Sequence, residues 1–123
     1  EGPRGVKDLC AVCRTFNLAV AMHSGAEFGV ELAAMIHTAS TIPAMPFAGD
    51  AHYHYLEDDI IVGGKLPYEN GAIAVPSGPG LGVQLDEDKM KHYEKYFEEK
   101  GDYYARFHQD PRRPDWYPMP GQT

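Results

Sequence analysis

The chain has 123 residues, which is the length of one domain and well short of the roughly 250 residues of a closed α/β barrel. Its 18 acidic and 11 basic residues give a formal net charge of −7 at pH 7, which repels nucleic-acid backbones and anionic membrane surfaces. Two cysteines are too few for a disulfide framework, and no apolar run resembles a membrane span or a signal peptide. We therefore expect a soluble, cytoplasmic protein that binds neither nucleic acid nor a membrane.

The first predicted elements are an amphipathic helix and a buried strand. Apolar residues recur at helical spacing from Val6 to Phe16, with charged residues between them, and Asn17 is typical of a helix end. The next run, Leu18 to Met22, is apolar without alternation, which is typical of a strand buried on both faces of a parallel sheet. His23 therefore stands where a buried strand ends.

The same order of elements then repeats. A polar turn follows His23, and a helical pattern resumes from Phe28 to Thr38. A second apolar stretch, Ala44 to Ala48, leads to Asp50 and His52. Alternating helices and strands are typical of a parallel sheet, in which ligands bind at the carboxyl ends of the strands. The polar residues that follow the two strands therefore mark a candidate site.

Beyond Leu56 the chain changes to turns, a helix and a proline-rich tail. Three short strands are predicted at residues 60–62, 65–68 and 72–75, and Asn70-Gly71 is a strong hairpin signal between the last two. The pattern from Glu87 to Lys100 predicts a helix, with Asp86 as its capping residue. The tail from residue 110 cannot be regular because of its prolines.

Several cysteines and histidines have a structural interpretation. Cys10 and Cys13 have the spacing of a redox motif, but they lie within a helical stretch, so we expect buried structural thiols. His37, His92 and His108 are expected to be surface or packing residues.

A second class of function is suggested by the segment HYHYLEDD, residues 52–59. On a strand, His52 and His54 would lie on one face, where both imidazoles could bind a metal. The pair resembles the first motif of cupin metal sites, although no second histidine motif follows. One alternative is a stand-alone metal-binding or sugar-binding module that uses His52 and His54. The other is that this histidine pair forms a polar strand or loop surface that binds no ligand.

The amino-acid sequences of several segments resemble those of a known family. Four segments are similar to the C-terminal third of acid-sugar dehydratases, the glucarate dehydratase-like branch of the enolase superfamily. In chain order they are VKDLCAVCRTFNLAVAMHS, GDAHYHY, NGAIAVPSGPGLGVQLD and a closing RRP. The resemblance implies an α/β fold, the C-terminal portion of a (β/α)7β TIM-type barrel with its last two strands and their helices, plus a C-terminal capping segment. Residues 1–62 would be the last part of the barrel domain, and residues 63–123 would pack on the barrel and the capping domain.

The resemblance also implies a chemistry. The histidine that matches His23 is a general base that removes the proton α to a carboxylate, while Mg²⁺ stabilises the enediolate and a β-hydroxyl leaves as water. Ser24 would contact the acid-sugar substrate, Asp50 and His52 would line the pocket, and Arg113 would bind the distal carboxylate. The family's metal ligands and the aspartate that pairs with the base lie on earlier strands, so we expect no metal ligand in this chain.

Three further expectations follow from the resemblance. The chain alone should be inactive, because the remainder of the barrel must be supplied in cis or by another chain, and the complete protein should be a homo-oligomer. Without that remainder, the apolar runs at residues 18–22 and 44–48 should be exposed. Residues 23–27 are His-Ser-Gly-Ala-Glu, whereas glucarate dehydratases have His-Ser-Asn-Asn-His at these positions. This difference leaves the identity of the sugar-acid substrate undecided. The alternative reaction is that of a racemase or epimerase of the same superfamily.

Overall fold

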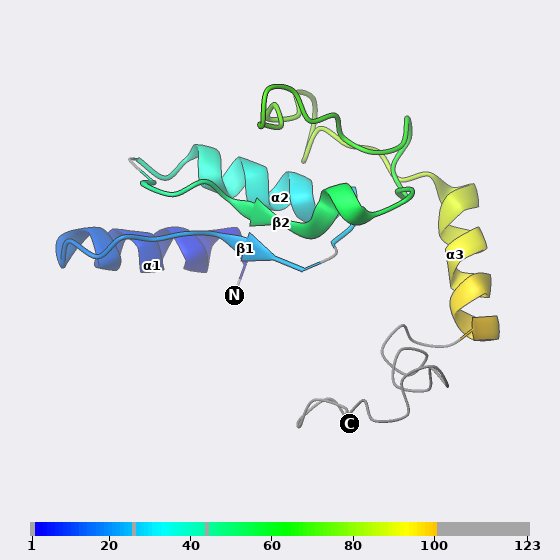
Figure 1. The fold of residues 1–123 in the computed structure, drawn as a ribbon, viewed down its shortest axis with the longest axis horizontal. Helices are drawn as coiled ribbons and strands as arrows, with labels where there is room; N and C mark the ends of the chain where they lie inside the picture. Colours follow the sequence, from blue (N-terminus) through cyan, green and yellow to red (C-terminus); the bar gives the residue numbers. More distant parts are fainter. Residues whose placement is uncertain (1, 26, 44, 101–123) are drawn as a thin grey trace. The chain divides into compact units, whose positions relative to one another are not determined.

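A computed structural model describes residues 2–25, 27–43 and 45–100 of the chain (Figure 1). The elements follow in the order α1 (Pro3–Thr15), β1 (His23–Ser24), α2 (Gly29–Ser40), β2 (Asp50–Ala51), the 3-10 helix η1 (His52–Tyr55) and α3 (Glu87–Lys100). Residues 1–87 form one compact unit, and residues 88–123 form a second one. The first unit contains both strands and all the described candidate site residues.

The first helix has well-defined ends. Pro3 occupies its first turn, where a missing N–H costs nothing. At the other end Asn17 adopts a left-handed conformation, with φ of 55°. The N–H of Leu18 donates to the Cys13 carbonyl at 2.8 Å, and the N–H of Asn17 donates to the Arg14 carbonyl at 3.1 Å. These two bonds form a Schellman motif, so the predicted helix and its stop at Asn17 are confirmed.

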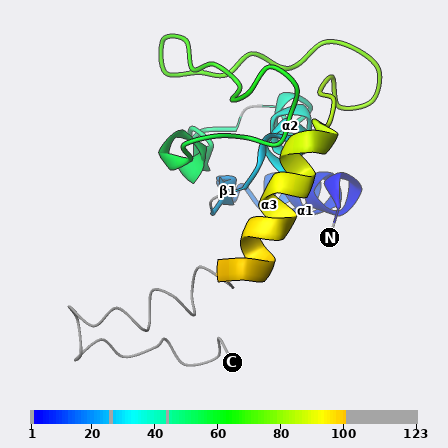
Figure 2. The ribbon, with the colours of Figure 1, turned by 90° about the vertical axis from the view of Figure 1, so that its right-hand side faces the viewer.

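A pair of short parallel strands forms the sheet, with α2 as the crossover between them (Figure 1). His23 lies opposite Asp50, and Ser24 lies opposite Ala51. The N–H of Asp50 also donates to the Met22 carbonyl at 2.9 Å. The predicted alternation of helix and strand, the second helix and the parallel pairing are confirmed, and Figure 2 shows α1 and α2 nearly end-on because their axes run alongside one another.

The predicted strands at residues 18–22 and 44–48 are wrong in extent, whereas their described residues include exposed apolar side chains, as expected for a chain without the remainder of the barrel. The structure assigns strands only to the residues that follow them, and Ala44 lies outside the described residues. Leu18 is 60% exposed and Phe47 is 56% exposed. A strand needs hydrogen-bonded neighbours, and the described residues supply each strand with only one short partner. The exposure agrees with the expectation for barrel strands that lack their neighbours.

Turns dominate the rest of the first unit. Asn70 and Gly71 both have positive φ, and Glu69 and Ala72 exchange two backbone hydrogen bonds, so the predicted hairpin turn is confirmed. The three flanking strands are wrong, because only isolated antiparallel bridges form there, including one between Ile61 and Leu85. In the second unit, α3 confirms the helix predicted from Glu87 to Lys100.

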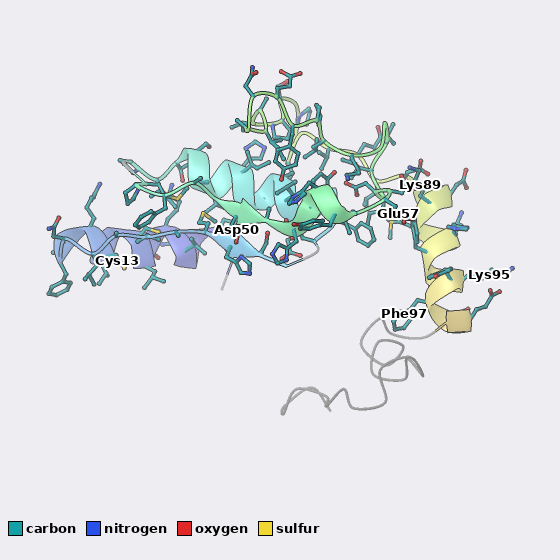
Figure 3. The ribbon with its side chains drawn as sticks, viewed as in Figure 1. Cys13, Asp50, Glu57, Lys89, Lys95 and Phe97 are labelled. Carbon is teal, nitrogen blue, oxygen red and sulfur yellow. The ribbon has the colours of Figure 1, made fainter. Side chains whose placement is uncertain are left out.

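The described core is small. Its buried apolar side chains come from α1, from α2 and from the segment after β2: Cys10, Leu32, Ala33, Tyr53 and Ile61. Cys10 is buried as predicted, whereas Cys13 is only half-buried, and both are free thiols. Figure 3 labels Cys13 on α1. His37, expected to be a surface or packing residue, is half-buried, and its Nε2 lies 3.1 Å from the Leu81 carbonyl. Across the described ranges, no helix is long and apolar enough to cross a membrane.

Candidate active site

The parallel pairing brings His23 and Asp50 into contact. His23 Nδ1 lies 3.2 Å from Asp50 Oδ2, and both side chains are exposed. Figure 3 shows Asp50 beside the β1–β2 pair. When Nδ1 donates its proton to the carboxylate, the second ring nitrogen, Nε2, keeps its lone pair. A carboxylate on Nδ1 also fixes the orientation of the ring. This arrangement is suited to an imidazole that accepts a proton at Nε2.

His52 completes the group of histidine and carboxylate side chains. It opens η1 directly after β2, and its ring centroid lies 5.4 Å from that of His23 in an edge-to-face arrangement. The structure therefore brings three of the predicted site residues together at the carboxyl ends of two neighbouring strands, as the sheet topology predicted.

Ser24 lies on the other face of the strand from His23, because successive residues of a strand point to opposite faces. Its Oγ is buried and has no hydrogen-bond partner among the described residues. A substrate that contacts both side chains must therefore lie beyond the end of β1. Arg113, like His108 and the proline-rich tail, lies outside the described residues.

The interpretation of His52 and His54 as two ligands on one strand face is wrong. Both residues lie on a 3-10 helix, and the intervening Tyr53 is fully buried. Residues two apart on such a helix point in different directions. His54 instead packs its ring against Tyr55, with centroids 3.9 Å apart, and against Tyr68, at 6.2 Å. Nowhere in residues 2–25, 27–43 or 45–100 do three histidine, cysteine or acidic side chains gather in a way that could hold a metal ion.

Asp59, the last residue of the HYHYLEDD segment, has a structural role. It is 0% exposed, and both its carboxylate oxygens accept a hydrogen bond from the Gly29 N–H, each at 3.0 Å. The Tyr53 hydroxyl also donates to Asp59, and it accepts a bond from the Leu66 N–H at 2.8 Å. Burial raises the pKa of Tyr53, and its hydrogen bond to Asp59 raises that pKa further. Asp59 thus joins the start of α2 to the segment that follows β2.

The Asp59 contact also explains a glycine at the start of α2. A Cβ atom on Gly29 would lie 2.5 Å from Asp59 Oδ2 and 2.7 Å from Ile61 Cδ1, so a larger residue requires these side chains to shift. Phe28, which precedes α2, offers no side-chain acceptor to the first turn, and Asp59 supplies it from a distant part of the chain. The sequence did contain a signal for this contact. Phenylalanine cannot cap a helix with its side chain, so the acceptor for the first turn of α2 had to come from another part of the chain.

Tyr68 brings a third segment next to the candidate site. Burial raises the pKa of its hydroxyl, and the carboxylates of Glu27 and Asp50 raise that pKa further. Glu27 is itself 4% exposed, and neither of its carboxylate oxygens has a hydrogen-bond partner among the described residues. The sequence interpretation assigned no role to Glu27 or to Tyr68.

Comparison with known proteins identifies the class to which this α/β unit belongs. Residues 1–89 match the model of the enolase C-terminal domain-like family, which is most of the chain. The chain therefore belongs to the enolase C-terminal domain-like family, and the resemblance drawn from its sequence is confirmed.

The chain is similar to individual members of the superfamily. The chain is 43% identical over 89 residues to a probable glucarate dehydratase of Streptomyces coelicolor, covering 72% of this chain and 20% of the relative. It is 38% identical over 61 residues to a chloromuconate cycloisomerase of Pseudomonas putida, covering 50% of this chain and 16% of the relative. It also resembles the structure of an enolase from Pseudomonas fluorescens with bound magnesium, potassium and tartrate, with a TM-score of 0.83 and 34% identity over 96% of this chain and 29% of that one. The chain thus spans less than a third of the length of each of these relatives.

Proposed function

We propose that this chain is part of a Mg²⁺-dependent acid-sugar dehydratase of the glucarate or galactarate type. The observation that carries the proposal is the His23–Asp50 pair at the carboxyl ends of two parallel strands. The similarity to a probable glucarate dehydratase and to a structure that holds magnesium and tartrate supports the substrate class. In this proposal the α/β unit is the end of a (β/α)7β barrel, and the division after residue 62 and the homo-oligomer stay predictions.

The proposed reaction assigns His23 the transfer of the proton. Its Nε2 accepts the proton α to a substrate carboxylate, and the imidazolium that forms is stabilised by the Asp50 carboxylate on Nδ1. The same imidazolium can then protonate the β-hydroxyl, which leaves as water. We assign Asp50 a positioning role in place of direct contact with substrate, although the resemblance gives this role to an aspartate of an earlier strand. Ser24, His52 and Arg113 remain the proposed substrate contacts.

The described residues do not form a magnesium site. His23 and Asp50 are paired with each other, and this part of the chain brings no third ligand to them. Mg²⁺ favours several oxygen ligands in near-octahedral geometry, so its site belongs to residues of the complete protein beyond those described here. This division of groups is the physical reason to expect no activity from the chain alone.

The test uses the complete protein with Mg²⁺ and a panel of hexaric acids that includes glucarate and galactarate. Nuclear magnetic resonance in D₂O reports exchange of the α-proton, and mass spectrometry separates a 2-keto-3-deoxy acid, which is lighter by one water, from an epimer of equal mass. His23→Asn should abolish exchange and leave Mg²⁺ binding intact, because asparagine cannot accept the proton.

Two further variants check the roles of the pair. Asp50→Asn should slow exchange by about 10- to 100-fold, because the ring loses the partner that orients it. His92→Asn is the matched control, since His92 is exposed on α3 and packs on Tyr93. Loss of Mg²⁺ binding in His23→Asn would contradict the base assignment, and an unchanged rate in Asp50→Asn would move the orienting carboxylate to another part of the complete protein.

A further inference from the structure

The helix η1 carries His52 next to the candidate site, but its own hydrogen bonds hold it weakly. It has 4 residues, and the residue before it, Ala51, has no polar side chain that could cap it. At its other end the N–H of Leu56 donates to the Tyr53 carbonyl at 3.1 Å. Hydrogen bonds of a 3-10 helix have poorer geometry than those of an α-helix, and the last carbonyls of any helix need partners from outside it. The position of His52 therefore depends on groups elsewhere in the chain.

Lys65 supplies partners at the carboxyl end of η1. Its ammonium group donates to the His54 carbonyl at 3.1 Å and also to the Leu56 carbonyl. The same Nζ lies 5.7 Å from the centroid of the Tyr53 ring, within the range of a cation–π interaction. A positive charge beside the last carbonyls of a helix is favourable. The next residue adds to this contact, because the N–H of Leu66 donates to the Tyr53 hydroxyl at 2.8 Å. These two residues therefore hold η1 from outside.

His52 is the group through which η1 reaches the candidate site. Its ring contacts those of His23 and Tyr55 edge to face, with centroid distances of 5.4 and 6.0 Å. Tyr55 stands between the two residues whose carbonyls Lys65 binds. His23 is oriented separately, by its contact with Asp50. A shift of η1 would therefore move His52 relative to His23 and leave the His23–Asp50 pair in place.

We propose that Lys65 is a positioning residue of the candidate active site: its ammonium group fixes η1, and η1 holds His52 beside His23, where His52 contacts the substrate. The proposal rests on the proposed function, because it takes His52 as a substrate contact. An ammonium group has three donors and no acceptor, so it suits carbonyls that converge at the end of a helix. An uncharged side chain of similar length, such as methionine, cannot replace it.

Nuclear magnetic resonance of the complete protein with isotope-labelled histidine tests the position of His52. A cross-peak between ring protons reports that two rings are in contact, and His23→Asn and His52→Asn each remove one ring and so assign the signals. Lys65→Met should remove the cross-peak between His23 and His52, whereas Lys65→Arg, which keeps a positive charge with N–H donors, should retain it. Lys95→Met is the matched control, because Lys95 is exposed on α3 and pairs with Glu99 at 3.8 Å.

Steady-state kinetics with the acid sugar that the complete protein dehydrates test the consequence for the reaction. Lys65→Met should raise KM about 10-fold with a nearly unchanged kcat, because His52 binds substrate while His23 transfers the proton. In a His52→Asn background the same change should have no further effect on KM, since Lys65 acts through His52. A general loss of stability would not produce this dependence on His52.

Two outcomes would overturn the inference. A cross-peak that persists in Lys65→Met would show that η1 keeps its position without the ammonium group. Additive effects of Lys65→Met and His52→Asn on KM would show that Lys65 does not act through His52. The α-proton exchange assay is a separate readout: a wild type without exchange refutes the proposed function, whereas the cross-peak tests the position of His52 without any substrate.

Discussion

Replacement of Asp59 by alanine tests the contact that joins the start of α2 to the segment after β2. The buried carboxylate accepts hydrogen bonds from the Gly29 N–H, the Tyr53 hydroxyl and the Ile60 N–H. A hydrogen bond to a charged group contributes about 1.5 to 3 kcal/mol, and the desolvation of the carboxylate offsets part of the total. We expect Asp59→Ala to lower the free energy of unfolding by about 3 to 5 kcal/mol, because three donors are left without their acceptor, at about 1 to 3 kcal/mol each.

Two measurements check this value. Urea denaturation gives the change in the free energy of unfolding, and amide hydrogen exchange reports whether the N–H groups of Gly29 and Leu66 lose their protection. Glu57→Ala is the matched control, because Glu57 is an exposed acid two residues away and should change stability by less than about 0.5 kcal/mol. A loss below about 1 kcal/mol in Asp59→Ala, with the Gly29 amide still protected, would refute the anchoring role of Asp59.

Two other predictions concern the same network. The pKa of Tyr53 is raised in the folded state. Above about pH 10 the unfolded chain therefore binds fewer protons than the folded chain. The free energy of unfolding should then fall by up to about 1.4 kcal/mol per pH unit. Tyr53→Phe should remove this part of the slope between pH 9 and pH 11 in urea denaturation, and an identical slope in the variant would contradict the assignment. Gly29→Ala should cost about 1 to 3 kcal/mol, because its Cβ would overlap Asp59 and Ile61. Gly25→Ala, where no atom lies within 4 Å of the added Cβ, should be nearly neutral in thermal unfolding, and equal effects of the two changes would exclude the steric explanation.

Part of the candidate site could be predicted without coordinates. His23 and Asp50 each follow an apolar run in an alternating helix and strand pattern, and the carboxyl ends of parallel strands lie side by side. Glu27 and Asp59 could not be predicted in this way. The burial of Asp59 accompanies its contact with Gly29, which is 30 residues away in the sequence, and acidic residues in connecting segments are usually exposed.

Local residue patterns were sufficient to predict the elements that depend on neighbouring residues. These are the helices α1, α2 and α3, the stop at Asn17 and the turn at Asn70-Gly71, because helical hydrogen bonds and turn conformations are formed within a few residues. Only the tertiary structure decided the extent of the strands, the contact of His23 with Asp50 and the burial of Asp59. Each of these depends on a partner that is distant in the chain, and a local pattern of residue types carries no information about which distant group supplies the hydrogen bond.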